Sequence, residues 1–232
     1  MISRFNKASQ ALAWLRRQEE RLRMTSAPDD FSLFLQTNVP IQESDDPIYK
    51  WVVGSNGVGR PDGRFYTVGN VRTEVPSGRE VTFWYSPMIM GEAEGLILLI
   101  VNNANGDVLI RAKSEPGNVG VVLDDGSPTR LLFSPPFQAS QSNMAAHGNR
   151  VPLVELARSV QDWEDGPEDG GRFYEKVSKY SLLMADAEVV ASQIAMSPNP
   201  EDFIWVTRRN LRELRRRGMV NGYLRSAMAT LA

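Results

Sequence analysis

The 232-residue sequence lacks cysteine and has a single histidine, His147. Without cysteine there can be no disulfide, thiol nucleophile, iron–sulfur cluster or thiolate zinc site. One histidine excludes a multi-histidine metal site within the chain, and a Ser-His-Asp triad would have to use it. The 26 basic and 28 acidic residues give a net charge of −2, which provides no field to draw the chain to nucleic acid. We therefore predict no metal site and no nucleic-acid partner.

Long apolar segments are also absent. The longest apolar run, residues 96–101, is far short of the ~20 residues that span a bilayer. Residues 1–24 carry arginines and acids without the continuous apolar stretch of a signal peptide. We expect a cytoplasmic protein that makes no contact with a membrane.

The composition is that of a globular protein, with 42% hydrophobic and 23% charged residues. Apolar residues spaced by three and four predict a helix from Ile2 to about Arg21, with residues 18–21 as a solvated stretch. Short β-branched and aromatic runs between turn residues then predict strands. These runs are residues 65–68, 81–85, 96–101, 108–112, 119–123 and 131–133. Residues 96–101 are nearly all Leu, Ile and Val, which favours a central strand buried on both faces.

The second half of the chain mixes both periods. We predict helices at residues 153–160, after Thr207 as N-cap, and from about Tyr223. Strands are expected at residues 172–174 and 180–185, with an acidic loop at 164–171. The whole is predicted to be one α+β domain, a mixed sheet flanked by helices. An N-terminal helix and connecting segment would occupy residues 1–45 and the main domain residues 46–232.

Two polar segments could carry chemistry. Residues 112–118 (Ala-Lys-Ser-Glu-Pro-Gly-Asn) place a cation, a carboxylate and an amide just after a strand, where α/β proteins often present reacting groups. The alternative is an exposed turn with a surface salt bridge. Residues 138–143 (Gln-Ala-Ser-Gln-Ser-Asn) could line a pocket for a hydroxyl-rich ligand or form an ordinary polar loop.

Basic residues suggest further sites. On a strand, Arg172, Tyr174 and Lys176 would share one face that suits a phosphate or diphosphate, or would protect an edge strand. His147 is either a surface residue or a general base. The glycines of residues 54–59 favour a hairpin turn over a phosphate loop. The arginines of residues 208–217 are either a solvated helix face or a contact for an acidic surface of another subunit, such as residues 164–169.

Taken in order, these segments resemble the NDP-hexose 2,3-dehydratases of deoxysugar biosynthesis. The resemblance runs from about Phe65 to Leu231 and rests on short motifs spread along the chain. They are Trp84 with Pro87 and Ile89; Ala112-Lys113 with Glu115-Pro116-Gly117-Asn118; Gln138-Ala139 with Ser142-Asn143; Val151-Pro152; Gly170, Arg172, Phe173 and Lys176; Phe203, Trp205 and Thr207; and Val220-Asn221 with Arg225-Ser226.

The resemblance implies a Nudix-like fold, of which this chain has length for one unit, and hence a homodimer. It implies a cofactor-independent lyase that removes water from a nucleotide-linked 4-keto-6-deoxyhexose. The residues that could act as base and acid are Glu115, Lys113, Tyr174 and His147. The residues that could bind the substrate are Trp84, Asn118, Gln138, Gln141, Ser142, Asn143, Arg172, Lys176, Asn221 and Arg225.

Several polar positions depart from the family pattern, among them Gln141, Met144, Asp169 and Tyr223. Two alternatives therefore stay open. One is elimination or isomerisation on a non-sugar natural product. A pocket lined by Met144, Phe137 and Trp84, without a diphosphate clamp, would favour this alternative. The other is a non-catalytic binding or assembly partner that uses the arginine-rich helix as its interface.

Overall fold

A computed structural model shows how these segments are arranged. It describes residues 2–25, 51–55, 57–61, 63, 66–75, 77–78, 80–91, 95–113, 121–122, 128–129, 131–140, 144–145, 151–167 and 172–231. The central sheet contains, in order across it, β1 (Ser3–Phe5), β14 (Phe203–Val206), β7 (Val108–Lys113), β6 (Gly95–Asn102), β13 (Val177–Ala185) and β12 (Glu164–Pro167). The predicted boundary between residues 45 and 46 lies outside the described residues.

The sheet is mixed, as the sequence predicts. β13 runs parallel to β6 and β1 runs parallel to β14, whereas the other pairs in the sheet are antiparallel. The predicted central strand is confirmed, because β6 lies between β7 and β13 and residues 97–101 are at most 1% exposed. Gly106, with φ of 72°, lies in the turn that joins β6 to β7.

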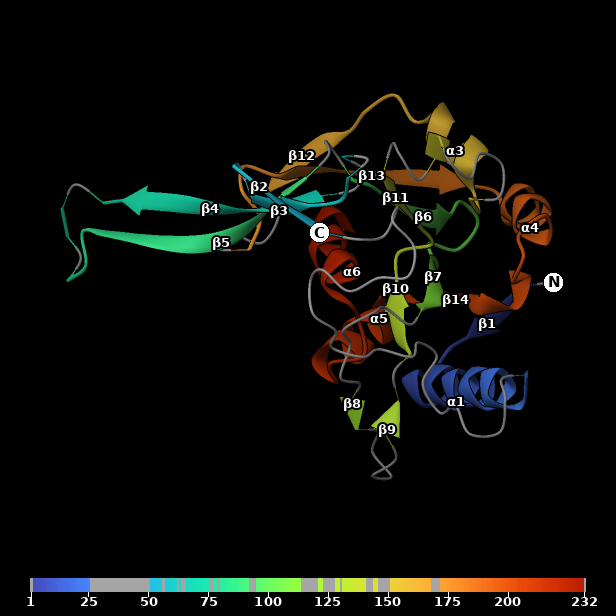
Figure 1. The fold of residues 1–232 in the computed structure, drawn as a ribbon. Coiled ribbons are helices and arrows are strands. Elements are labelled where there is room, and N and C mark those ends of the chain that lie inside the picture. Colours follow the sequence, from blue (N-terminus) through green and yellow to red (C-terminus); the bar gives the residue numbers. More distant parts are fainter. Residues whose placement is uncertain are drawn as a thin grey trace.

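Helices cover both faces of the sheet (Figure 1). Ile97, Leu99 and Val101 of β6 pack in one core with α1 (Ala8–Thr25), α5 (Arg208–Arg216) and α6 (Gly222–Ala227). Leu98 and Ile100 point the other way and pack with α3 (Val154–Ser159) and α4 (Ala187–Ala195). The short helices η2 (Pro200–Asp202) and η3 (Met228–Leu231) precede β14 and follow α6.

A second sheet, of order β2-β3-β4-β5, carries a long hairpin. Its strands are β2 (Val52–Gly54), β3 (Gly57–Gly59), β4 (Tyr66–Glu74) and β5 (Phe83–Gly91). β4 and β5 pair along their full nine-residue lengths and extend well beyond the body of the molecule (Figure 1). The predicted turn at residues 54–59 is confirmed as the β2–β3 hairpin. β8 (Val121–Val122) and β9 (Pro128–Thr129) form a separate small ladder.

Local caps agree with the sequence in the C-terminal region. The Thr207 side chain accepts a hydrogen bond from the Asn210 amide and so begins α5. Within this helix Glu213 forms ion pairs with Arg216 and Arg217. The interactions with these two arginines lower the pKa of the Glu213 carboxyl, with the hydrogen bond from Arg217 as the largest cause.

The N-terminal prediction was wrong in two places. Residues 3–5 are a strand, because they pair in parallel with residues 204–206 of β14, and α1 begins only at Ala8. Gln18 is 9% exposed and therefore belongs to the buried face of α1, which continues one turn beyond Trp14 and Leu15. Periodicity could not show either result, since both depend on partners far away in the sequence.

Three other elements differ from the prediction. The acidic residues 164–167 form β12 on the edge of the sheet rather than a loop, and α4 was not predicted. Residues 172–174 make a single bridge to Ile89 of β5 instead of a regular strand.

Among the described helices, none is both long and apolar enough to cross a bilayer. The described residues also contain no group of three side chains that could hold a metal ion.

Candidate active site

The central sheet divides at one end, which we call the fork. β6 and β7 pair with each other only at Ile100–Leu109 and Val101–Val108. Beyond these pairs β11 (Phe137–Ser140) takes up the free edge of β6, and β10 (Leu132–Ser134) takes up that of β7. Pro135 and Pro136 join β10 to β11, which suits a connection that makes no ladder bonds of its own. The fork therefore opens at the start of β6 and the end of β7.

Two predicted site residues meet across this fork. Lys113 is the last residue of β7 and Gln138 lies on β11, 25 positions further along the chain. The Lys113 Nζ atom lies 3.4 Å from Gln138 Oε1, and both side chains are part-buried. The structure thus brings together one residue from each of the two polar segments noted in the sequence.

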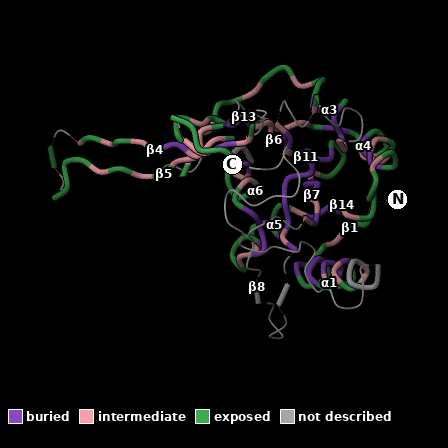
Figure 2. Tube along the Cα trace, viewed as in Figure 1, coloured by how far each residue is buried: buried purple, intermediate pink, exposed green. Residues whose placement is uncertain are grey.

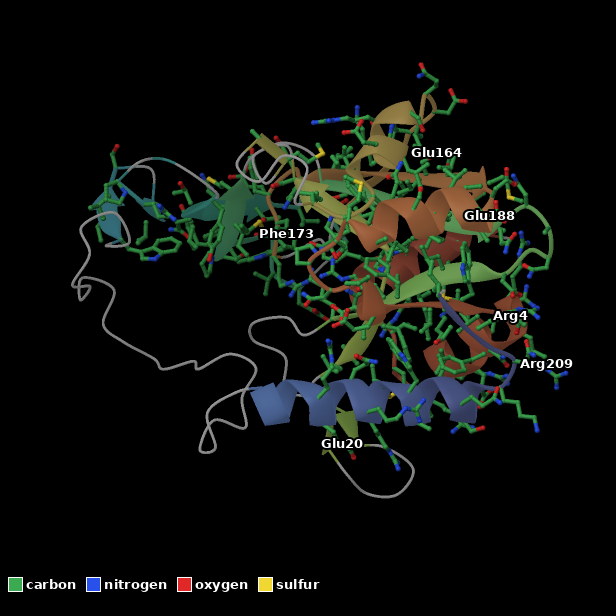
Figure 3. All side chains as sticks on the ribbon, turned by 90° about the vertical axis from the view of Figure 1, so that its right-hand side faces the viewer. Arg4, Glu20, Glu164, Phe173, Glu188 and Arg209 are labelled. Atoms are coloured by element: carbon green, nitrogen blue, oxygen red, sulfur yellow. The ribbon has the colours of Figure 1, made fainter. Side chains whose placement is uncertain are left out.

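A second group of cations surrounds Phe173. The Arg172 guanidinium carbon lies 5.3 Å from the centre of the Phe173 ring and the Lys176 Nζ atom lies 4.9 Å from it. The backbone on either side of Phe173 is held by Ile89 of β5, whose amide donates to the Arg172 carbonyl and whose carbonyl accepts from the Tyr174 amide. Figure 3 shows Phe173 next to the ribbon of β5.

The predicted strand face of Arg172, Tyr174 and Lys176 is therefore corrected. Glu175 adopts φ of 47°, the left-handed region that few side chains enter, and this breaks the two-residue alternation. Arg172 and Lys176 converge on Phe173, whereas Tyr174 is 42% exposed. Two cations held about one ring give a surface suited to an anion with two charged groups.

The Lys113–Gln138 pair and the Phe173 cations are found at the same end of β6. Gly95, its first residue, pairs with Ser140 of β11 on one side and with Ser178 of β13 on the other. Gln138 lies opposite Ile97, two residues inside β6, whereas Lys176 precedes Ser178 by two residues and so lies just beyond the start of β6. A Cβ atom on Gly95 would lie 2.9 Å from the Ser178 hydroxyl oxygen, so glycine allows β13 to lie close to β6 at this point.

Other predicted site residues are placed differently. Trp84 lies on β5 opposite Thr73, near the free end of the long hairpin. Arg225 is exposed on α6, and Asn221 is 5% exposed at its N-terminus. Six predicted site residues lie outside the described residues: Glu115, Asn118, Gln141, Ser142, Asn143 and His147.

Comparison with known proteins now gives the family. The family model described as NDP-hexose 2,3-dehydratase matches residues 18–231. The chain belongs to the NDP-hexose 2,3-dehydratase family.

Two curated relatives are dTDP-4-dehydro-6-deoxy-alpha-D-glucopyranose 2,3-dehydratases. The protein from Saccharopolyspora spinosa is 26% identical over 226 residues, which are 96% of this chain and 42% of the relative. The protein from Streptomyces violaceoruber is 28% identical over 176 residues, which are 73% of this chain and 35% of the relative. The chain thus spans less than half the length of these two NDP-hexose 2,3-dehydratases.

In this member of the NDP-hexose 2,3-dehydratase family, one cavity lies near the fork and another lies away from it. One of about 180 Å³ is lined in part by Leu96, Met144 and Arg158, and Leu96 pairs with Ala139 of β11. Another of about 200 Å³ lies between α3 and α4, lined in part by Leu153 and Met196. The second is mostly apolar and contains none of the described candidate residues, so we give it no role in the chemistry.

Arg111 is a cation that the sequence analysis did not single out. It precedes Lys113 by two residues, so both side chains leave the same face of β7. Its guanidinium lies 5.5 Å from the centre of the Phe203 ring, and burial lowers its pKa, partly offset by Asp202. The available signal was an arginine between the apolar residues Ile110 and Ala112 of a predicted strand.

Asp202 links this region to α1, because its carboxylate accepts from Arg21 at 3.1 Å. Burial raises the pKa of Asp202 above its ordinary value of 3.8, and Arg111 and Arg21 only partly offset the rise. A carboxyl with a raised folded-state pKa binds more protons in the folded than in the unfolded state. The stability it contributes is therefore greatest at low pH and is lost as pH rises through the folded pKa.

We expect an Asp202→Asn variant to lose this pH dependence. The free energy of unfolding of the wild type, minus that of the variant, should fall as pH rises from below 3.8 to neutrality. Urea unfolding at a series of pH values measures the difference, and Glu20→Gln, a change on the exposed side of α1, is the control. A difference that rises with pH would contradict the assigned direction.

Asn221 has a structural function that its predicted role did not include. Its Oδ1 atom accepts a hydrogen bond from the Leu224 backbone amide at 2.9 Å and so caps the start of α6. Its own backbone amide donates to the Phe133 carbonyl of β10. We expect Asn221→Ala to lower the free energy of unfolding by about 1–2 kcal/mol, as is usual for the loss of a helix N-cap. Urea unfolding measures this, with Asn70→Ala in the exposed part of β4 as the control. Unchanged stability with weaker substrate binding would instead favour direct contact with the substrate.

Proposed function

We propose that this chain removes water from a nucleotide-linked 4-keto-6-deoxyhexose at the fork, a 2,3-dehydration. The observation that carries the proposal is the pair of cations on Phe173 at the same end of β6 as the Lys113–Gln138 contact. One group suits the diphosphate of a nucleotide sugar and the other suits a polar sugar with a carbonyl. Membership of the family and the names of the two relatives support the same substrate class.

The reaction needs acid and base groups but no external electron acceptor. The C4 ketone acidifies the C3 proton, a base removes that proton, and the electron pair forms an enolate. The enolate then expels the C2 hydroxyl, which leaves as water after protonation, and the resulting enol becomes a 3-ketone. We propose that no cofactor takes part, because the substrate's own ketone holds the electron pair.

Roles follow from position. Lys113, with three donors and an amide partner in Gln138, is placed to stabilise the enolate oxygen or to protonate the leaving hydroxyl. Glu115, Tyr174 and His147 are the proposed alternatives for the base. Arg172 and Lys176 would hold the diphosphate, and the remaining proposed contacts are Trp84, Asn118, Gln138, Gln141, Ser142, Asn143 and Arg225.

The finer features of the predicted protein belong to the same proposal. We propose a Nudix-like relationship for the mixed sheet with its flanking helices, a homodimer as the working assembly and the cytoplasm as its location. Residues 1–45 would be an N-terminal segment attached to the domain at 46–232.

The non-sugar alternative has less support. A pocket lined by Met144, Phe137 and Trp84, without a diphosphate clamp, would favour it. Met144 lines the cavity of about 180 Å³, but Phe137 is 1% exposed in the core and Trp84 lies near the free end of β5. In our proposal the two cations on Phe173 would bind a diphosphate, which this alternative does not need.

Incubation with dTDP-4-keto-6-deoxyglucose tests the function. We expect mass spectrometry to show a product lighter by one water molecule, formed about a thousandfold more slowly by the Lys113→Met variant. A nucleotide sugar that protects the protein against thermal unfolding without being changed would instead favour the binding role. If the nucleotide sugar neither protects the protein against thermal unfolding nor gives the product, the proposal is contradicted.

A further inference from the structure

Arg111 is a half-buried cation that the mechanism described so far does not use. It lies on β7, which Figure 2 shows mainly in the purple of buried residues. The Arg111 Nε atom is itself buried and has no hydrogen-bond partner among the described residues. The nearby carboxylate of Asp202 accepts a hydrogen bond from Arg21. A buried donor without a partner is costly, so it calls for an explanation such as a role in catalysis or ligand binding.

Arg111 and Lys113 leave the same face of β7, at the end of the strand that forms the fork. One residue separates them, so their Cα atoms lie about 7 Å apart along the strand. Leu109 lies on this face too and packs in one core with Leu98 of β6. Leu96, two residues before Leu98, lines the cavity of about 180 Å³. The two cations and this cavity therefore lie on one face of the sheet.

The cations at this end of the sheet follow one another in a definite order. The cations on Phe173 lie beside the start of β13, on the far side of β6 from β7. Lys113 comes next, because its Nζ atom reaches Gln138 across the fork. Arg111 comes last, because its guanidinium lies 5.5 Å from the centre of the Phe203 ring on β14. The order from β13 toward β14 is therefore the diphosphate contacts, Lys113 and Arg111.

The groups of the proposed substrate come in a matching order. The diphosphate is attached at C1, the C2 hydroxyl is on the neighbouring carbon, and the C4 ketone is on the carbon opposite C1 in the ring. With the diphosphate at the cations on Phe173, the C2 hydroxyl would lie nearer to Lys113 and the C4 oxygen nearer to Arg111. Their chemistry agrees, because an ammonium can give a proton to a leaving hydroxyl, whereas a guanidinium keeps its protons and suits an oxygen that gains charge.

We propose that Arg111 binds the C4 oxygen of the sugar and stabilises the enolate, and that Lys113 protonates the C2 hydroxyl as it leaves. A base removes the C3 proton, and the negative charge develops on the C4 oxygen beside Arg111. The C4 carbonyl then re-forms, the C3–C4 π electrons form the C2–C3 double bond, and the C2–O bond breaks. The Lys113 ammonium supplies the proton that makes the leaving group water, while Arg111 neither gains nor loses a proton. This inference rests on the proposed function.

Proton exchange at C3 separates the two roles, because it requires the enolate but not the departure of the hydroxyl. With dTDP-4-keto-6-deoxyglucose in D₂O, we expect Arg111→Met to slow both C3 exchange and elimination by about a hundredfold or more, the usual effect of losing one oxyanion donor. Lys113→Met should exchange C3 at close to the wild-type rate of proton removal and lose elimination. Arg111→Lys, which keeps the charge, should recover part of the C3 exchange.

Arg212→Met, at an exposed arginine of α5, is the control and should change neither rate. Titration with dTDP shows that each variant is folded, and Arg111→Gln replaces Arg111→Met if the latter does not bind dTDP. Wild-type C3 exchange in a folded Arg111 variant, or exchange lost in Lys113→Met but kept in Arg111→Met, would overturn the proposal. A wild type that neither exchanges C3 nor eliminates water would overturn the proposed function, and this assignment with it.

Discussion

Lys113→Met is expected to lower kcat/KM for the nucleotide sugar by about a thousandfold, within the range usual for a lost proton donor or oxyanion donor. Lys113 is the cation at the fork, and its Nζ atom lies 3.4 Å from Gln138 Oε1. Methionine keeps most of the length and apolar character of the side chain but has no proton to donate. We expect kcat to account for the loss, while the affinity for the substrate stays close to that of the wild type. Steady-state kinetics with direct product detection measures both quantities.

Gln138→Leu and Lys7→Met make this result specific. Gln138→Leu removes the partner of Lys113 and should lower kcat by less, because the cation remains. Lys7 is exposed just before α1 and outside the proposed site, so Lys7→Met should leave kcat near the wild-type value. Full activity of Lys113→Met, with an unfolding free energy equal to that of the wild type, would remove Lys113 from the mechanism.

The second large effect is expected in binding. Replacing both Arg172 and Lys176 by alanine should weaken the binding of dTDP by about a hundredfold or more, since each charge-assisted contact contributes about 1.5–3 kcal/mol. KM for the nucleotide sugar should rise with little change in kcat, because a diphosphate contact is made equally in the ground and transition states. Isothermal titration with dTDP alone measures the effect without catalysis.

The matched control for this variant is a double substitution on α5. Arg215 and Arg216 are exposed cations on a helix outside the fork, so their replacement by alanine removes the same charge. The affinity for dTDP should then change little, apart from long-range effects that salt screens. Equal losses in both double variants would mean that net charge, and not the cations on Phe173, governs binding.

Features that depend on neighbouring residues could be predicted from the sequence. The apolar run of β6 identified the buried central strand, and Thr207 identified the start of α5. Gly218 follows that helix with φ of 72°, a left-handed position that glycine accepts and that commonly ends a helix. In each case the decisive interaction joins residues that are close in the sequence, so the local sequence pattern is enough to predict it.

Features that depend on distant pairing could not be predicted. The fork exists because β7 pairs with β10, and β6 with β11, where β6 and β7 no longer pair with each other. No local sequence pattern predicts this pairing. The left-handed backbone of Glu175 interrupts the expected strand, so Arg172 and Lys176 both lie on Phe173. The hydrogen bonds that hold this segment come from Ile89 of β5, far away in the sequence. Arg111 was overlooked because its neighbours on β7 are apolar, although an arginine there is itself a signal.

The C3 proton of the substrate provides the most direct test that the fork is a dehydratase site. With dTDP-4-keto-6-deoxyglucose in D₂O, we expect proton NMR to show loss of the C3 signal together with elimination of the C2 hydroxyl in the wild type. Lys113→Met should bind the nucleotide sugar and leave the C2 hydroxyl in place. A wild type that binds the substrate but leaves both C3 and C2 unchanged would contradict the account.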